Sequence, residues 1–258
     1  MAGRLPIGSR PHGHFERNVE IRGVTHRADH HVGHSGQFTR GDLENELILE
    51  RGEFVVDVVG EGEDSLPRDE SNAIIQAVKD GFSAIYPDRE LPIENIRFKS
   101  VNRIPPARGL GSSSAALVSG LAAGLALAGQ DLAAPQTKQL LLQLAADCEG
   151  HPDNVAPAIY GGFQVSINTG KQWVTQAVRL PDGMQAILFI PDFESLTSET
   201  RAALPKEIPV ADAVYNISRA AMLVNSFSTG NLEALRCVLY KRFSPTARFQ
   251  HLIASSFN

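Results

Sequence analysis

The stretch that decides the fold of this chain is Pro105-Pro106-Ala107-Arg108-Gly109-Leu110-Gly111-Ser112-Ser113-Ser114-Ala115-Ala116. Two glycines and three serines stand immediately before a helix-like run that extends from Ala115 to Ala128. Glycine allows the backbone to approach a ligand closely, and the free N–H groups at the start of a helix attract an anion. The stretch therefore predicts a loop that holds phosphate at the N-terminus of a helix.

The commoner phosphate loops do not fit this stretch. A Walker A loop needs a lysine after its last glycine, and Ser112 stands there instead. The dinucleotide fingerprint needs a third glycine where this chain has Ser114. The catalytic H-R-D and D-F-G motifs of protein kinases are also missing. The sequence therefore argues against these three classes and leaves a different phosphate-binding family.

Composition limits the partners that we expect. The chain has 258 residues, of which 43% are hydrophobic and 21% charged, a typical soluble composition. A net charge of -5 argues against a general nucleic-acid binder. Two cysteines match neither a disulfide framework nor a zinc pattern, so we expect a reducing compartment, the cytoplasm. The run from Ala115 to Ala128 is too short to span a membrane, and we interpret its Gly120 and Gly124 as close packing against a sheet.

Periodicity predicts strands and helices that alternate irregularly, which favours the α+β class. Ser71 is the expected N-cap of the first helix, and Arg51-Gly52 is the expected joint between the first two strands. The predicted strands are 47–49, 54–59, 93–101, 163–167, 173–178 and 186–190, and the predicted helices are 74–85, 115–128, 135–149, 196–204, 210–228 and 231–240.

Residues 1–43 differ from the rest of the chain. They hold six of the eight histidines, between His12 and His34, and their few apolar residues have no helix or strand period. A histidine metal site is one interpretation, and a disordered or frame-displaced segment is the interpretation that we favour. Translating the source gene in its other two frames would test the displacement.

A second polar motif follows the loop by about forty residues, Glu149-Gly150-His151-Pro152-Asp153-Asn154. A carboxylate can hold Mg²⁺ beside phosphate oxygens, and His, Asp and Asn can hydrogen-bond a small polar substrate. A purely structural interpretation is that these six residues form the end of a helix followed by a capped turn, without any role in binding or catalysis. The pairing with the first motif weakens that structural interpretation.

The two motifs together resemble the GHMP small-molecule kinases, and the second is similar to the homoserine kinases within that family. The resemblance covers about residues 44–240 and includes 191–194, 200–205 and 212–220. It implies a two-lobed α+β fold, with a ribosomal S5 domain 2-like N-terminal lobe and a ferredoxin-like C-terminal lobe. We expect the first lobe over 44–165 and the second over 166–258, after the atypical segment 1–43.

The resemblance also implies the activity and its residues. Homoserine kinases transfer the γ-phosphoryl group of ATP to the hydroxyl of L-homoserine, a small-molecule substrate, in a step toward threonine. ATP would be held by the loop residues Pro105, Pro106, Ala107, Arg108, Gly109, Leu110, Gly111, Ser112, Ser113, Ser114 and Ala115. Mg²⁺ would be held by Ser113 and Glu149, and homoserine by His151, Asp153, Asn154, Arg201 and Arg248, with Asn154 and Glu149 as the catalytic residues and no general base assigned.

This chain departs from the family pattern at both ends. The resemblance implies a substrate-binding turn near residues 24–36 and a glycine-rich turn after the last residue, Asn258, and neither is present. We therefore expect a fold that is incomplete at both ends, marginal stability, and weak activity or none. Two alternatives stay open, namely another GHMP kinase acting on mevalonate or a sugar, and a catalytically impaired remnant. The family often forms dimers, so a homodimer is expected, without nucleic-acid or membrane partners.

Overall fold

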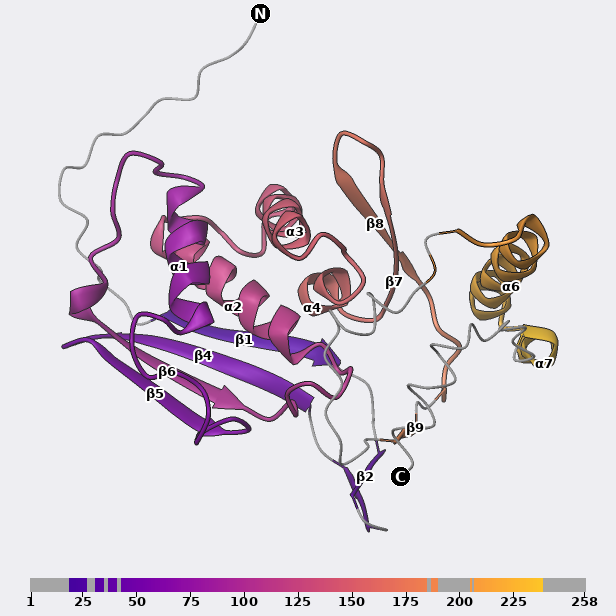
Figure 1. The fold of residues 1–258 in the computed structure, drawn as a ribbon, viewed down its shortest axis with the longest axis horizontal. Helices are drawn as coiled ribbons and strands as arrows, with labels where there is room; N and C mark the ends of the chain where they lie inside the picture. The colour runs from indigo at the N-terminus through magenta and orange to yellow at the C-terminus, as the bar shows by residue number, and fades with distance from the viewer. Residues whose placement is uncertain are drawn as a thin grey trace, which may run out of the picture.

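A four-stranded sheet forms the base of the molecule (Figure 1). The computed structural model describes residues 19–26, 31–34, 37–40, 43–184, 187–189, 205 and 207–238, and the backbone alone before residue 44, at 187–189 and at 236–237. The strands lie in the order β1 (Val19–His26), β4 (Leu43–Arg51), β6 (Ile96–Asn102) and β5 (Val55–Gly60). β4 is antiparallel to both β1 and β6, whereas β5 is parallel to β6.

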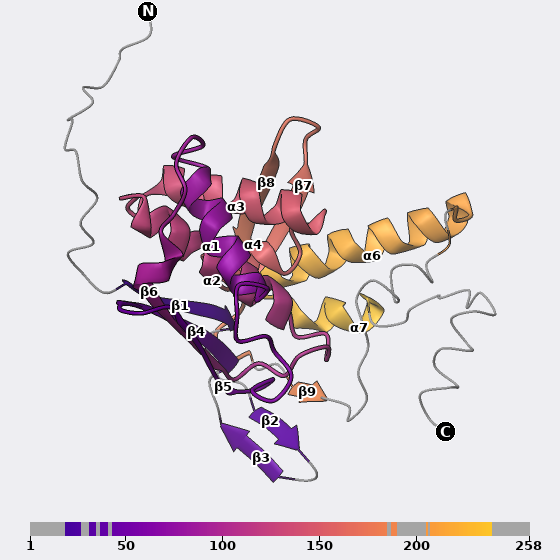
Figure 2. The same cartoon turned by 60° about the vertical axis from the view of Figure 1, so that its left-hand side comes forward.

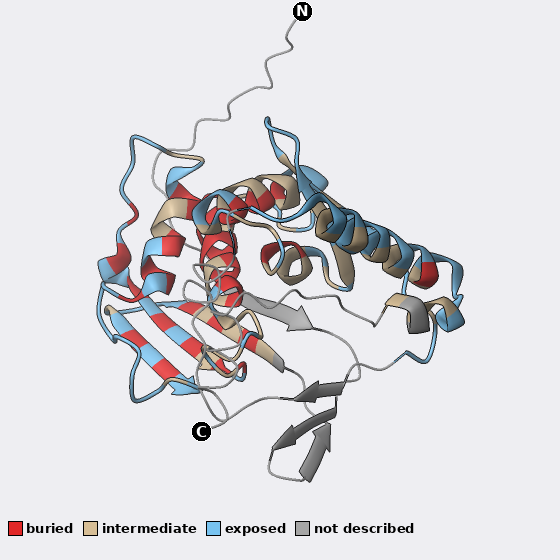
Figure 3. Ribbon diagram, turned by 45° about the vertical axis from the view of Figure 1, so that its right-hand side comes forward, coloured by how far each residue is buried: buried red, intermediate tan, exposed pale blue. Residues whose placement is uncertain are grey.

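The alternation of side chains along the strands gives this sheet one covered face and one open face. In β6, Ile96 and Phe98 are buried, whereas Arg97 and Lys99 beside them are exposed. Successive strand residues point to opposite faces, so apolar residues at every second position gather on one side. Figure 3 shows the resulting stripes of buried and exposed residues on the strands.

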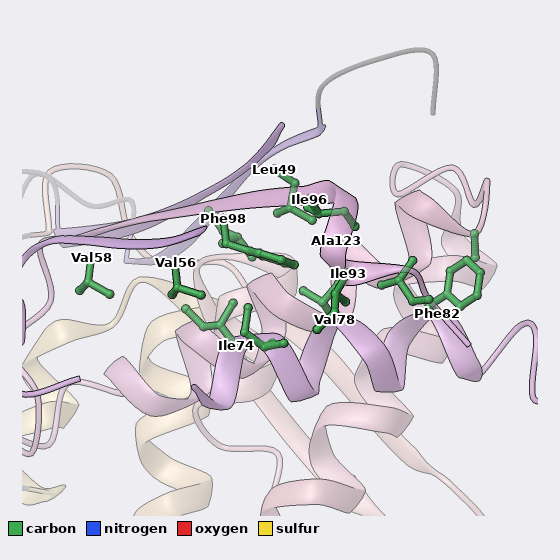
Figure 4. Close-up of a cluster of buried hydrophobic side chains, with 14 residues drawn as sticks. Leu49, Val56, Val58, Ile74, Val78, Phe82, Ile93, Ile96, Phe98 and Ala123 are labelled. Atoms are coloured by element: carbon green, nitrogen blue, oxygen red, sulfur yellow. The ribbon is translucent and has the colours of Figure 1, made fainter. Parts of the chain in front are cut away.

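Two helices cover the buried face, α1 (Ala73–Ser83) and α2 (Ser112–Leu127) (Figures 1 and 2). Ile74 and Val78 of α1 point toward Phe98 of the sheet, as Figure 4 shows. Ala123 of α2 belongs to the same buried cluster. This cluster packs the helix that follows the Gly/Ser loop against the strand that precedes the loop.

The expected joint between the first two strands is confirmed, although the two strands that it joins do not pair with each other. Arg51-Gly52 does connect β4 to β5, but the two strands are not neighbours, because β6 lies between them. β5 runs parallel to β6 and reaches it through α1, which is the usual route between parallel strands. Local periodicity identified both strands and carried no information about which strands pair.

The glycines of α2 approach a helix and not the sheet, which corrects the expectation that Gly120 and Gly124 pack against the sheet. A Cβ atom on Gly124 would lie 2.1 Å from the carbonyl oxygen of Val78 in α1, and one on Gly120 would lie 2.5 Å from the Cβ of Ala77. Gly81 of α1 faces α2 in the same way, because its Cβ would lie 2.3 Å from the carbonyl oxygen of Leu121. The three glycines therefore let the two helix backbones touch. Among the described helices, none combines the length and apolar character needed to cross a bilayer.

The N-cap of α1 is Asn72, so the expectation of Ser71 is wrong. The Asn72 side-chain oxygen accepts a hydrogen bond from the N–H of Ile74 at 3.0 Å, and its amide donates to the carbonyl of Pro67 at 2.7 Å. Ser71 instead donates both its hydroxyl and its N–H to the Asp69 carboxylate. Serine and asparagine are both favoured N-cap residues, so the sequence does not distinguish Ser71 from Asn72. In the structure, Asp69 accepts the hydrogen bonds of Ser71, and Asn72 caps the helix.

We expect Asn72→Ala to lower the free energy of unfolding by about 1–2 kcal/mol, because it removes a buried cap and leaves the Pro67 carbonyl without this donor. Ser71→Ala is the matched control and should change stability by less than about 0.5 kcal/mol. Urea unfolding followed by circular dichroism measures both variants. A larger loss in the Ser71 variant would contradict the assignment of the cap.

α3 (Pro135–Glu149), α4 (Val155–Tyr160) and the antiparallel pair β7 (Phe163–Asn168) and β8 (Trp173–Val178) lie on the α2 side of the sheet (Figures 1 and 2). Pro135 begins α3 and Gly150 ends it with a positive φ of 74°, as the sequence predicts. The further helices are η1 (Ile93–Asn95), α6 (Val210–Thr229), η2 (Leu232–Ala234) and α7 (Leu235–Val238).

The segment before residue 44 differs from the expectation. The sequence predicts no element there, yet Val19–His26 pairs with β4 as β1, so disorder and a missing edge strand are wrong for these residues. β1 begins with the alternation Val19-Glu20-Ile21-Arg22, a two-residue period of only four residues that is easily overlooked in this segment. β2 (His31–His34) pairs with β3 (Gln37–Arg40) and runs parallel to β9 (Ile187–Phe189). The histidine side chains, and with them the histidine metal site, lie outside the described part, and frame displacement stays a hypothesis.

The element order confirms the mixed α+β class. Within the described residues, antiparallel and parallel strand pairings occur together with consecutive helices, without a strict βα alternation. The helix expected over 196–204 and the chain after residue 238 lie outside the described residues. The boundary between the two lobes, expected near residue 165, stays a prediction.

Candidate functional site

The loop from β6 to α2 is anchored where it leaves the sheet. The side-chain oxygen of Asn45 in β4 accepts hydrogen bonds from the N–H groups of Arg103 and Ile104, at 3.0 and 3.2 Å. The Ile104 side chain is buried and fixes the same point of the chain. The sheet therefore holds the first residues of the loop and directs the following Gly/Ser segment to the start of α2.

The start of α2 keeps its first N–H groups clear of side-chain acceptors. Its N-cap is Gly111, with a φ of 73°, and no side chain accepts a hydrogen bond at this end. The N–H of Ala115 donates the first hydrogen bond of the helix, to the Gly111 carbonyl at 2.9 Å. The N–H groups of Ser112, Ser113 and Ser114 precede this bond at the N-terminal end of the helix. Gly111 has no side chain and adopts the left-handed backbone conformation, which lets the loop turn sharply into the helix. Free N–H groups and the helix dipole make this end suitable for a phosphate.

The two sequence motifs meet at this helix end. Glu149 is the last residue of α3, and the Ser114 hydroxyl of α2 lies 2.6 Å from each of its two carboxylate oxygens. The Glu149 side chain is 14% exposed, so its carboxylate is shielded but reachable from solvent. The structure thus places a carboxylate beside the N-terminus of the predicted phosphate-binding helix, although 35 positions separate Ser114 from Glu149 in the sequence.

His151 and Asp153 extend this polar cluster. The His151 Nδ1 atom lies 2.5 Å from an Asp153 carboxylate oxygen and 3.7 Å from Glu149 Oε2. The contact between His151 and Asp153 is short but does not have the geometry of a hydrogen bond. Asp153 also accepts a hydrogen bond from the N–H of Asn154 at 2.9 Å. These contacts order the turn between α3 and α4.

Asn154 lies against the loop. It is the N-cap residue of α4, and a Cβ atom placed on Gly111 would approach its side chain to 3.4 Å. The short helix α4 was not predicted, because six residues are too few to show a helical period. The position of α4 brings Asn154 of the second motif close to Gly111, the glycine at which the first motif turns into α2.

Arg108 carries a buried nitrogen without a partner. Among the described residues, no acceptor lies within hydrogen-bond reach of its Nη1 atom, which is shielded from solvent. A buried guanidinium nitrogen normally pairs with a carboxylate, a carbonyl or an anion. Its place in the loop fits a negatively charged ligand such as a phosphate.

Two neighbouring serines of the loop lie in different environments. Ser113, the predicted metal ligand, is exposed, whereas the neighbouring Ser114 is buried and holds the Glu149 carboxylate. The sequence shows three consecutive serines, Ser112 to Ser114, but it does not show which of their hydroxyl groups faces α3. Arg201 and Arg248 lie outside the described residues.

The thiol beside the site is protonated at neutral pH. Partial desolvation raises the pKa of the exposed Cys148 thiol above its usual range, and the nearby carboxylates of Asp80, Glu149 and Asp147 raise it further. A thiol is a poor nucleophile until it ionises. Cys148 is therefore not a candidate for covalent chemistry at this site.

Comparison with known proteins identifies the relatives of this site. Residues 72–162, which include both motifs, match the model of the GHMP kinases N terminal domain. A homoserine kinase of Moorella thermoacetica is 38% identical over 178 residues, covering 69% of this chain and 57% of the relative. A homoserine kinase of Nitratiruptor sp. is 34% identical over 212 residues, covering 82% of this chain and 70% of the relative. The chain thus spans somewhat more than half the length of the Moorella relative.

The fold has solved counterparts. The crystal structure of homoserine kinase from Cytophaga hutchinsonii superposes with a TM-score of 0.60 at 20% identity, covering 78% of this chain and 64% of that chain. Similarity at this level of identity supports the architecture alone. It agrees with the mixed α+β fold described above.

Proposed function

Because this chain belongs to the homoserine kinases of the GHMP kinase family, we propose that it transfers the γ-phosphoryl group of ATP to the side-chain hydroxyl of L-homoserine. The observation that carries the proposal is the contact between Ser114 and Glu149, which joins the two motifs at one helix end. Phosphoryl transfer depends mainly on positioning and charge neutralisation, and this site offers both.

The loop residues 105–115 hold the triphosphate in this proposal. The free N–H groups at the start of α2 donate to phosphate oxygens, and Arg108 neutralises part of their charge. The support is the absence of a side-chain cap on α2 and the unpartnered guanidinium nitrogen among the described residues.

Glu149 and Ser113 hold Mg²⁺ in this proposal. The donor set fits, because Mg²⁺ prefers oxygen ligands and takes one or two carboxylates beside substrate phosphates. The bound ion would neutralise charge on the phosphate oxygens. Glu149 keeps its carboxylate at the helix end, and Ser113 offers an exposed hydroxyl one residue from Ser114.

The homoserine site consists of His151, Asp153, Asn154, Arg201 and Arg248 in this proposal. Asn154 orients the acceptor hydroxyl, and the support is its position beside Gly111. The two arginines bind the carboxylate of the amino acid, as the family resemblance implies. Residues 44–165 form the ATP-binding lobe and 166–258 the C-terminal lobe, and the enzyme acts in the cytoplasm as a homodimer.

A substrate panel tests the proposal. We expect ADP release with ATP and Mg²⁺ to depend on L-homoserine and to stay at background with mevalonate or galactose. Release with mevalonate or galactose would favour another GHMP kinase activity. ADP binding without turnover of any acceptor would favour a catalytically impaired member of the family.

A further inference from the structure

Two buried serines of α2 differ in one respect. Ser114 and Ser119 are each 2% exposed, but within the described residues only Ser114 has a hydrogen-bond partner, the Glu149 carboxylate. The Ser114 hydroxyl lies 2.6 Å from both carboxylate oxygens, and its single proton can serve one oxygen at a time. Ser114 therefore has a specific contact that Ser119 lacks.

The Glu149 carboxylate has little other support. Within the described residues, the basic side chain recorded within 4.0 Å of this carboxylate is that of His151, whose Nδ1 atom lies 3.7 Å from Oε2, beyond hydrogen-bond distance. Glu149 also ends α3, where the negative end of the helix dipole disfavours a carboxylate. Within the described part of the chain, Ser114 is the only hydrogen-bond donor to this carboxylate.

We propose that Ser114 is a positioning residue that holds the Glu149 carboxylate at the N-terminus of α2, ready to bind a divalent cation. The inference rests on the proposed function, because it assumes that a cation and a nucleotide share this site. Neighbouring helix residues point about 100° apart, and the Ser114 hydroxyl bonds the Glu149 carboxylate whereas the Ser113 side chain is exposed. The two serines therefore have separate roles, with Ser113 left free for the cation.

Removal of the hydroxyl should weaken cation binding specifically. Residues that orient a metal ligand typically contribute about 10–100-fold to metal affinity. We expect Ser114→Ala to weaken Mn²⁺ binding about tenfold or more in the presence of ADP, measured from the electron paramagnetic resonance signal of free Mn²⁺. ADP affinity in the presence of EDTA, measured by calorimetry, should stay within about twofold, because the loop N–H groups are unchanged.

Ser119→Ala is the matched control. It removes an equally buried hydroxyl from the same helix without touching Glu149, and it should match the wild type in both measurements. A double-mutant cycle adds a second criterion. If Ser114 acts through Glu149, Ser114→Ala should have little further effect on Mn²⁺ binding in a Glu149→Gln background. Ser114→Cys, with a weak donor, replaces Ser114→Ala if the alanine variant does not fold.

The outcomes are distinct. Unchanged Mn²⁺ affinity in the Ser114 variant overturns the inference, and so does an equal loss of metal-free ADP affinity, which would indicate a general loop defect. A wild-type chain that binds neither ADP nor Mn²⁺ contradicts the proposed function and the inference with it. Normal wild-type binding with an unaffected Ser114 variant overturns the inference alone.

Discussion

Glu149→Gln is expected to lower kcat/KM for homoserine by about a thousandfold while leaving the fold intact, because the proposal assigns the negative charge of this side chain to cation binding. Such charge stabilisation contributes several kcal/mol to phosphoryl transfer. The amide keeps the size of the side chain and can still accept the hydrogen bond from Ser114. Coupled measurement of ADP release gives the activity, and circular dichroism checks the fold.

Asp147→Asn is the matched control for that experiment. Asp147 lies on the same helix, is exposed, and accepts a hydrogen bond from Trp173 Nε1 at 2.8 Å, which asparagine can retain. We expect activity within about twofold of the wild type, because exposed substitutions usually have small effects. Near-wild-type activity in the Glu149 variant would refute its assigned role.

Gly124→Ala is expected to destabilise the protein by about 3 kcal/mol or more, a large part of a usual margin of about 5–15 kcal/mol. The new Cβ would lie 2.1 Å from the Val78 carbonyl oxygen, 2.7 Å from the Phe82 nitrogen and 2.9 Å from the Gly81 Cα. All three are backbone atoms, so relief requires α1 and α2 to move apart. Urea unfolding measures the loss.

Gly52→Ala controls for the loss of glycine itself. A Cβ at this position would meet only the Cβ of Arg97, at 3.9 Å, which is ordinary contact. We expect a change within about 0.5 kcal/mol. If the Gly124 variant is as stable as the Gly52 variant, the result contradicts the close approach of α1 and α2 described above.

Secondary structure between residues 43 and 184 was largely predictable from local pattern. α3 begins at Pro135 and ends before Gly150 as expected, because proline and glycine restrict the backbone at those two positions. The pairing of β5 with β6 was not predictable, because the alternation along β5 is the same whichever strand lies beside it. The N-cap at Asn72 depended on which side chain Asp69 engages.

The sequence by itself determined the family and the two motifs, and it predicted phosphate binding at the first of them, because motifs depend on residue types at close spacing along the chain. Only the tertiary structure decided that Ser114 rather than Ser113 faces Glu149, and that Gly124 contacts a helix rather than the sheet. Both outcomes depend on the rotation of α2 about its axis. That rotation is set by packing against α1, α3 and the sheet, and no local pattern in α2 specifies it.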